Sequence, residues 1–239
     1  PGHISLIKAS QNKKNKTIVS IFINPTQFNS IRDFKNYPRN INKDITLLKK
    51  LKVDYLFLPK AKDIYKLKSQ NFILKKKDNI LCANIRNGHF EGVLKVMNIL
   101  MTNIKSKDLY MGEKDYQQLY LIKKLLEKKY KTKVISCKTI RDKNKVALSS
   151  RNFLLKKSNL VIAGIIYKKL ENIKKNIKNH KHISNFLEIK KKELKNKYKI
   201  KIDYLELRNI NNLKISNINK NSRLFIAYYL SNVRLIDNI

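Results

Sequence analysis

Short runs of β-branched and aromatic residues recur along the first part of the chain. The runs at 17–23 and 53–58 are almost wholly apolar, and each stops beside a proline. Continuous runs of this kind are typical of strands buried in a parallel sheet. Similar but weaker runs at 80–85, 109–111 and 133–138 predict further strands of the same sheet.

Between these runs, apolar residues recur every three or four positions, which predicts amphipathic helices. Helical spacing is found at 41–51, at 89–104 and in the segment that follows Gly112. Asn40 or Asn42 is suited to cap the first of these helices. Strands that alternate with helices imply right-handed crossovers. We therefore expect an α/β fold, with a Rossmann-like doubly wound parallel sheet.

The pattern changes after Asn152. Two Lys-rich helical stretches, 156–177 and 183–198, precede two segments, 202–207 and 223–230, that alternate like antiparallel strands. A smaller α+β domain is the natural interpretation. We place the division so that residues 1–140 form the domain with the parallel sheet and residues 141–239 form the smaller C-terminal domain.

The formal net charge of +37 would ordinarily suggest a nucleic-acid or membrane partner. Here lysine is spread through nearly every segment together with Asn and Ile, which indicates a compositional drift rather than a concentrated basic groove. We expect no dedicated nucleic-acid partner and no membrane partner. Cys82 and Cys137 lie far apart in the sequence, which fits a reducing, cytoplasmic location.

Rare residues mark candidate functional segments. The chain has only 5 Gly, and Gly2, Gly88, Gly92 and Gly112 lie in or beside segments that look like a nucleotide site. Of its 54 basic residues 46 are Lys, so each Arg suggests a need for the planar guanidinium fork, as for phosphate or carboxylate.

Ligands of open α/β sheets collect beyond the carboxyl ends of the strands. Three segments fall there, namely 24–28, 112–115 and 140–141. If Gly112 opens a helix, its free N–H groups suit an anion, and Lys114 adds a charge for a phosphate. An ordinary solvent-exposed helix N-terminus would have the same sequence pattern. A Gln117–Gln118 pair on an exposed helix face would likewise give no indication of function.

Other polar positions also have two interpretations. The Ser149–Arg151 segment offers hydroxyls and a guanidinium for phosphate oxygens, or it is a plain turn. His3 is expected at a helix N-terminus, where it would lie beside a bound phosphate or serve only the structure. His180 and His182 have metal-like spacing but no carboxylate cluster, so we expect no metal site formed by side chains.

Seven ordered motifs resemble those of the pantoate–β-alanine ligase family, which belongs to the nucleotidyltransferases that carry a His-x-Gly-His motif. The resemblance extends from Pro1 to Ile239. The motifs are Gly2-His3, Ile23-Asn-Pro-Thr-Gln-Phe28, Asp33-Phe-x-x-Tyr-Pro-Arg39, Arg86-x-Gly-His-Phe-x-Gly-Val93, Gly112-Glu-Lys-Asp-Tyr-Gln-Gln-Leu119, Ala147-Leu-Ser-Ser-Arg-Asn152 and Arg234-Leu-Ile-Asp-Asn-Ile239.

The resemblance implies an enzyme that adenylates pantoate with Mg²⁺-ATP and releases pyrophosphate. β-Alanine then attacks the pantoyl adenylate to give pantothenate and AMP. It also implies a homodimer in which each subunit has a Rossmann-like domain, here residues 1–140, and a C-terminal lid domain, here residues 141–239. The first strand and the first His of the family motif would precede Pro1, and Asn29, Arg32 and Asn87 depart from the family's usual residues.

Site roles follow from the resemblance, position by position. His3, Lys114, Ser149 and Arg151 are the implied catalytic residues. Gln27 and Gln118 would bind pantoate, with Asn24 and Arg86 in the same cavity and β-alanine near Gln27. The implied ATP contacts are Gly2, His3, Gly112, Glu113, Lys114, Asp115, Ile140, Leu148, Ser149, Ser150 and Arg151.

Two alternatives stay open. One is a related adenylylating enzyme that acts on another acid, and the other is an inactive basic RNA-binding protein. Exchange of pyrophosphate into ATP that depends on pantoate would distinguish all three.

Overall fold

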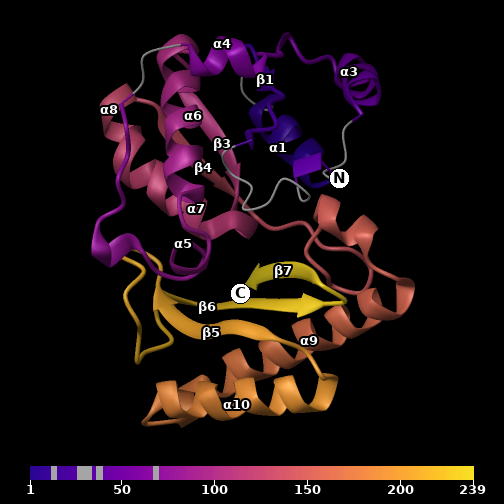
Figure 1. Cartoon of the computed structure of the whole chain (residues 1–239), viewed down its shortest axis with the longest axis vertical. Coiled ribbons are helices and arrows are strands. Elements are labelled where there is room, and N and C mark those ends of the chain that lie inside the picture. Colours follow the sequence, from indigo (N-terminus) through magenta and orange to yellow (C-terminus); the bar gives the residue numbers. More distant parts are fainter. Residues whose placement is uncertain (12–14, 26–33, 36–39, 67–69) are drawn as a thin grey trace. The chain divides into compact units, whose positions relative to one another are not determined.

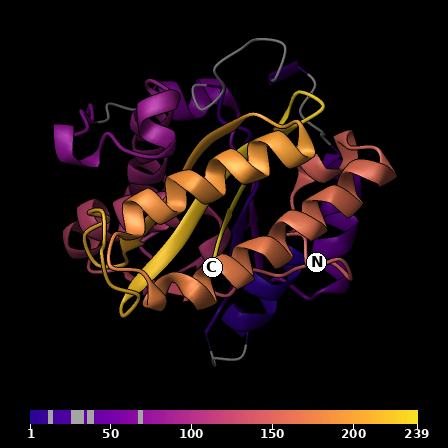
Figure 2. The same cartoon turned by 90° about the horizontal axis from the view of Figure 1, so that it is seen from below.

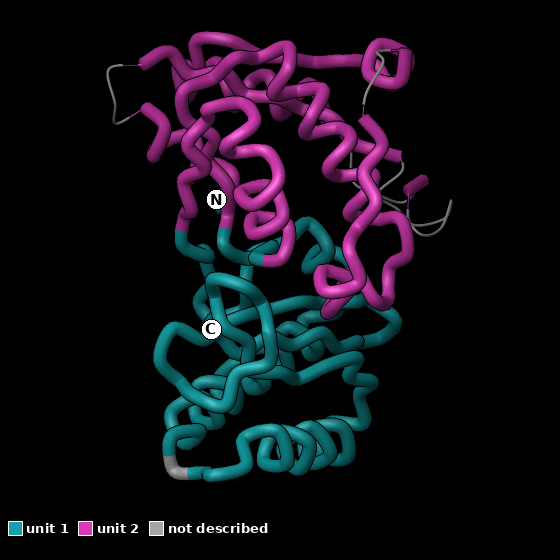
Figure 3. The backbone as a smooth tube through the Cα atoms, turned by 90° about the vertical axis from the view of Figure 1, so that its left-hand side faces the viewer, with its two compact units in different colours: residues 1–2, 113–116, 138–239 teal, residues 3–112, 117–137 magenta. Residues whose placement is uncertain are grey.

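The computed structural model describes residues 1–11, 15–25, 34–35, 40–66 and 70–239 (Figure 1). The described chain divides into two compact units, which Figure 3 colours separately. The parallel-sheet unit contains residues 3–112 and 117–137. The antiparallel-sheet unit contains residues 1–2, 113–116 and 138–239.

Two pairs of parallel strands define the parallel-sheet unit. β1 (Ile18–Ser20) pairs with β2 (Tyr55–Phe57), and β3 (Asp108–Gly112) pairs with β4 (Lys133–Cys137). The expected α/β class is therefore confirmed. β1 is shorter and less buried than predicted, since Ile18 is 38% exposed. Within the described residues β1 has one strand neighbour, so its second edge contributes no burial.

Helices connect these strands. Their bounds, in chain order, are α1 (Gly2–Gln11), α3 (Ile41–Lys50), α4 (Ala61–Tyr65), η2 (Lys76–Asp78), α5 (Cys82–Ile85), α6 (His89–Asn103), η3 (Glu113–Asp115), α7 (Tyr116–Ile122), the π-helical η4 (Lys123–Glu127) and α8 (Lys128–Tyr130). Asn40 caps α3 as predicted, because its side chain accepts the Lys43 N–H. The predicted helix at 89–104 is confirmed as α6, whose apolar face packs with Ile64.

Residues 80–85 do not form the strand that their apolar pattern suggested. They form a turn and the short helix α5 instead, with Leu81 at a positive φ of 50°. The side chain of Gln117 accepts the Cys82 N–H at 3.0 Å and donates to the Ile80 carbonyl at 2.7 Å. This amide satisfies backbone groups that a neighbouring strand would otherwise pair. Gln117 is therefore buried, at 6% exposure, and does not lie on an exposed helix face.

The antiparallel-sheet unit contains β5 (Ile202–Asn209), β6 (Ser222–Leu230) and β7 (Val233–Asn238), in that order across the sheet. The helices α9 (Lys157–Asn176) and α10 (Ile183–Tyr198) lie side by side across one face of this sheet (Figures 1 and 2). Two short 3-10 helices, η5 (Ser150–Leu154) and η6 (Ile177–Asn179), complete the unit.

The core of this unit lies between the sheet and the helices. Apolar side chains of β5 and β6 pack against the inward face of α9 and α10. The most completely buried residues of this core include Leu205, Leu207, Leu224, Ile166, Leu170 and Ile177. The two Lys-rich helices and the antiparallel strands predicted after Asn152 are confirmed. The division into domains 1–140 and 141–239 stays a prediction. Among the described helices, none combines the length and apolar character needed to cross a membrane.

Candidate phosphate-binding site

Lys114 lies in a 3-10 turn between β3 and α7. Gly112 is the last residue of β3 and does not open a helix, because η3 (Glu113–Asp115) intervenes before α7 begins at Tyr116. Its φ is not among the positive values, so the turn does not require glycine at this position. The ammonium of Lys114 lies 3.4 Å from the exposed carboxylate of Asp115. Glu113 instead pairs with Arg223 at 3.1 Å.

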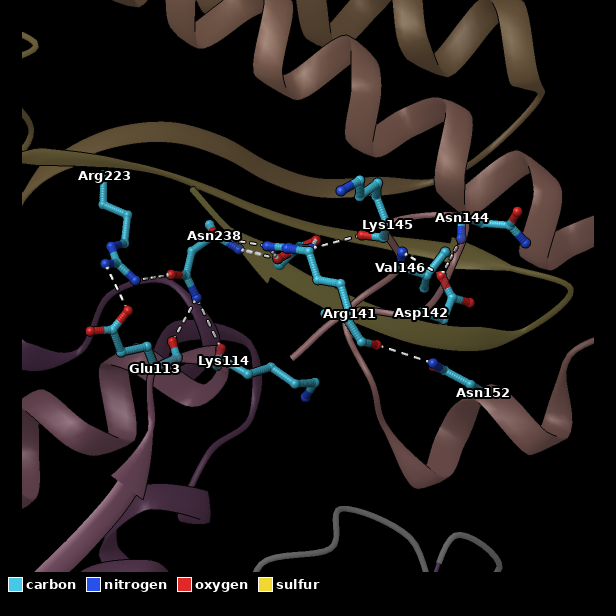
Figure 4. Close-up of polar contacts among 12 residues, drawn as sticks. Glu113, Lys114, Arg141, Asp142, Asn144, Lys145, Val146, Asn152, Arg223 and Asn238 are labelled. Atoms are coloured by element: carbon cyan, nitrogen blue, oxygen red, sulfur yellow. Dashed lines mark hydrogen bonds and ion pairs between the residues drawn. The ribbon is translucent and has the colours of Figure 1, made fainter. Parts of the chain in front are cut away.

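The second predicted phosphate segment begins with a tight loop. Arg141 and Ala147 form an antiparallel bridge, and the Leu148 N–H donates to the Ile140 carbonyl at 3.0 Å. Within the loop, the Asp142 carboxylate accepts the N–H groups of Asn144 at 2.8 Å and Val146 at 2.9 Å (Figure 4). These bonds fix the loop without any ligand.

Ser149 follows this loop and caps η5. Its hydroxyl accepts the Arg151 N–H at 3.3 Å, so the two side chains start from adjacent, fixed backbone positions. Ser150 is the first residue of η5 and is half-buried. The Asn152 side chain donates to the Ala147 carbonyl at 3.0 Å and so closes the segment. Both ends of the Ser-Ser-Arg motif are therefore anchored.

A hollow in the antiparallel-sheet unit brings the two segments together. It is lined by Lys114, Ser149 and Arg151, and also by Tyr228, Arg234 and Asp237 of the sheet. Three of these side chains are cations and one is an anion. We call this feature the phosphate hollow.

The single anion of the phosphate hollow is already neutralised. Arg141 donates to both carboxylate oxygens of Asp237, at 2.7 and 2.8 Å. Burial alone would lower the pKa of Arg141, but the hydrogen bonds and charge of Asp237 outweigh it and raise that pKa. Arg234 is compensated in the same way, because it donates to Asp203 at 2.9 Å. Lys114 and Arg151 add positive charge to the lining of the hollow, which suits an anion.

Tyr228 contributes a neutral group to the same hollow. Burial raises the pKa of its phenol far above the ordinary value. The hydroxyl therefore stays protonated at any physiological pH and adds no negative charge that would repel a phosphate.

The remaining predicted site residues lie in the parallel-sheet unit or at its start. Gly2 and His3 are the first two residues of α1, which confirms the expected helix N-terminus. Asn24 is buried, and its amide donates to the Gly92 carbonyl at 3.1 Å and accepts the Tyr65 hydroxyl at 2.5 Å. Arg86 lies 3.0 Å from the His89 ring nitrogen.

Of the two residues predicted to bind pantoate, the structure describes only Gln118. Gln118 lies half-buried on α7, and its amide makes no hydrogen bond within the described part of the chain. Gln27 falls outside the described residues. The structure thus brings Lys114, Ser149 and Arg151 together around one hollow, and it describes Gln118, Asn24 and Arg86 within the other unit.

Comparison with known proteins identifies the family. A model of the pantoate–β-alanine ligase family matches residues 1–239. The chain belongs to the pantoate–β-alanine ligase family. Among curated relatives, the pantothenate synthetase of Francisella philomiragia is 42% identical over 99% of this chain and 84% of its own length. That of Christiangramia forsetii is 38% identical over 100% of this chain and 86% of its own.

Solved structures of this ligase family share the fold. The Francisella tularensis pantoate–β-alanine ligase, solved with β,γ-ATP and β-alanine, has a TM-score of 0.81 and 40% identity, covering 100% of this chain and 84% of its own. The Thermus thermophilus pantothenate synthetase has a TM-score of 0.90 at 27% identity, with coverages of 100% and 88%. The Rossmann-like domain with a smaller C-terminal domain is thereby shown for this chain.

Sequence reasoning missed some residues around the phosphate hollow. Arg234, Asp237 and Asn238 entered only as part of a family motif, and we assigned no role to them. The missed signal was the pair of acceptor and donor side chains at 237–238, directly after an apolar run. Gly164 was the one glycine that we connected with no site, yet a Cβ there would lie 2.6 Å from the Asn144 carbonyl oxygen.

Proposed function

We propose that this ligase binds the triphosphate of ATP in the phosphate hollow and uses it to activate pantoate for condensation with β-alanine. The observation that carries the proposal is that Lys114, Ser149 and Arg151 line one hollow whose carboxylate, Asp237, is neutralised by Arg141. Such a site attracts a polyanion, and its charged hydrogen-bond donors offset the free-energy cost of removing water from the phosphates.

The reaction has two steps. A carboxylate oxygen of pantoate attacks the α-phosphorus of ATP, the bond to the β-phosphate oxygen breaks, and pyrophosphate leaves. The amine of β-alanine then attacks the acyl carbon of pantoyl adenylate. AMP departs with the electron pair of the acyl–oxygen bond, and the amine loses one proton to solvent.

The residues around the hollow act by stabilising negative charge on the phosphates. In the first step, negative charge builds on the α-phosphoryl oxygens and on the departing pyrophosphate. Lys114 and Arg151 are fixed donors that stabilise this charge, and fixed donors act more strongly on the transition state than on the ground state. The Ser149 hydroxyl adds a neutral donor. Mg²⁺ enters with ATP, since Mg²⁺ binds chiefly to phosphate oxygens and water.

The acid and amine are bound by the residues that the family resemblance selects. Gln118, whose amide has no partner within the described residues, is available to pantoate, and Gln27 would be its companion. The resemblance assigns Asn24 and Arg86 to the same cavity, and the side chains of both are held by neighbouring groups. The resemblance also assigns His3 to the phosphates of ATP. It further implies a homodimer, which analytical ultracentrifugation would test.

Isotope exchange between pyrophosphate and ATP tests the first step alone. Exchange should require pantoate and should not occur with β-alanine in its place. Arg151→Lys keeps the charge but loses the fork, so kcat for exchange should fall about tenfold or more, with a smaller rise in the KM for ATP. Lys114→Ala should likewise lower kcat for exchange more than it raises the KM for ATP.

A matched control is Lys143→Ala, which removes an exposed lysine from the adjacent loop. This variant should exchange at the wild-type rate. Full exchange activity in both Arg151→Lys and Lys114→Ala would show that the phosphates bind elsewhere.

A further inference from the structure

The side chain of Asn238 is bonded to the segment that carries Lys114. Asn238 lies near the end of β7 and is only 4% exposed. Its amide donates to two carbonyl oxygens at once, those of Glu113 and Lys114, both at 3.0 Å (Figure 4). Residues 113 and 238 are thus joined across a long stretch of sequence by one side chain.

The two carbonyls have a special relation to Lys114. The Glu113 carbonyl belongs to the peptide plane that precedes the Lys114 Cα, and the Lys114 carbonyl belongs to the plane that follows it. Since peptide units are planar, the orientation of these two planes sets φ and ψ of Lys114. Asn238 therefore fixes the direction in which the Lys114 side chain leaves the backbone.

Asn238 is itself held from two sides. Its amide oxygen accepts from Arg223 at 2.7 Å, and Arg223 also pairs with Glu113 and covers the Tyr116 ring at 4.6 Å. On the other side, its backbone N–H donates to Asp237 at 2.7 Å. The same Asp237 receives both donors of Arg141.

Asp237 and Asn238 together therefore contact both segments of the phosphate hollow. Asp237 holds Arg141, where the 141–151 segment begins, and Asn238 holds the 113–114 turn. We call this pair of residues the β7 clamp. Every polar atom of its two side chains has a protein partner, so neither side chain is needed as a ligand for ATP.

We propose that Asn238 is a positioning residue for the adenylation step, acting through Lys114 rather than on the substrate. The proposal rests on the proposed function, because it assumes that Lys114 meets the phosphates of ATP. Without the two amide bonds, the 113–114 turn gains freedom and the ammonium spends less time where charge develops. The loss falls mainly on kcat, since positioning matters most in the transition state.

Asn238→Asp is the sharpest substitution. It preserves the shape and the acceptor for Arg223, but it replaces the donor by an oxygen that faces two carbonyl oxygens. Asn159→Asp is the matched control, because it makes the same change at an exposed amide of α9 that donates to the Ser231 hydroxyl. Asn238→Ser, smaller and neutral, serves if Asn238→Asp does not fold, as judged by circular dichroism.

Pyrophosphate exchange is measured for wild type, Asn238→Asp, Lys114→Ala and the double variant. We expect Asn238→Asp to lower kcat about tenfold with a smaller change in the KM for ATP, and Asn159→Asp to change neither. The double variant should be no slower than Lys114→Ala alone, because Asn238 has no effect once its target is absent. Asn238→Ser should lie between wild type and Asn238→Asp, since its hydroxyl can donate one bond.

Three results would overturn the proposal. Wild-type kcat in Asn238→Asp, or in Asn238→Ser in its place, would show that the carbonyl bonds are dispensable. Losses that multiply in the double variant would show that Asn238 acts independently of Lys114. Full activity of Lys114→Ala would instead refute the phosphate assignment itself, and the positioning role would fall with it.

Discussion

Replacing Gly164 by alanine tests how tightly the 142–146 loop is seated on α9. A Cβ at this position would lie 2.6 Å from the carbonyl oxygen of Asn144 and 3.1 Å from its Cβ. Favourable contacts between heavy atoms lie near 3.5 Å, so the loop or the helix must move by roughly 0.9 Å to relieve the overlap. The oxygen belongs to the backbone and cannot simply rotate away.

Two opposing effects decide the result. Alanine in a helix interior is favoured over glycine by about 0.5–1 kcal/mol. Overpacking a close contact costs about 1–3 kcal/mol. The cost exceeds the gain over most of this range, so we expect a net destabilisation of about 1–2 kcal/mol. For a chain of this size each kcal/mol lowers Tm by about 2–4 °C.

Thermal unfolding and pyrophosphate exchange are measured on the same samples. The loop leads directly to Ser149 and Arg151, so any movement that relieves the overlap should slow exchange. Asn172→Ala, at an exposed position of the same helix, has no such overlap; it measures the helix-propensity gain, reduced by the exposed hydrogen bond that Asn172 accepts from Asn176. If Gly164→Ala raised Tm as Asn172→Ala does and left exchange unchanged, the close approach would not exist.

Two further predictions concern pantoate and pH. Gln118→Ala should raise the KM for pantoate and slow pantoate-dependent exchange by an amount equivalent to about 2 kcal/mol, while Tm stays near the wild-type value. Normal turnover of this variant at sub-saturating pantoate would refute the assignment of Gln118 to pantoate. Burial, with a smaller effect of Arg223, lowers the pKa of Lys174 to about 8, so the folded state releases this proton more readily than the unfolded chain. Between pH 8 and about 10.5 the unfolded state binds more protons, and stability should rise with pH over this window. This rise in stability should be absent in Lys174→Met. Its size is reduced by the partial exposure of the Lys174 side chain. An equal pH dependence of stability in wild type and Lys174→Met would contradict the prediction.

The strands and helices that the sequence predicted well are those that bury one continuous face. α3, α6, α9 and α10 each show the helical spacing of their apolar residues, and nothing outside the helix is needed to recognise it. Residues 80–85 failed because their backbone is satisfied by a distant side chain, that of Gln117. A pattern of hydrophobicity carries no information about such a partner.

β7 was missed although the sequence contains a signal for it. Ser231 and Asn232 both have positive φ, at 44° and 65°, and Leu230 pairs directly with Val233. This is a two-residue hairpin turn, for which Asn is a favoured residue. Two apolar runs separated by Ser-Asn therefore predict a hairpin, and we had treated the second run only as a family motif.

The scarcity of glycine indicated several special backbone positions, and the structure bears on three of them. Gly88 does need its freedom, since its φ is 74° at the N-cap of α6. Gly112 has an ordinary φ and open space around a Cβ. At Gly164, which lies in a helix and in none of the motifs, a side chain would strike backbone. Rarity alone did not distinguish a residue required by a ligand from one required by packing.

The arginines support the same distinction and show how the site is built. A guanidinium fork was expected to mark a phosphate or a carboxylate, and Arg141 uses its fork on the carboxylate of Asp237 and stacks over Tyr167 at 4.0 Å. Arg223 likewise bridges Asn238 and Glu113. Lysine cannot replace either one, because a single ammonium does not supply two parallel donors and a flat face. In the antiparallel-sheet unit these two forks therefore hold backbone segments in place, and the proposal assigns the anion to Lys114 and Arg151.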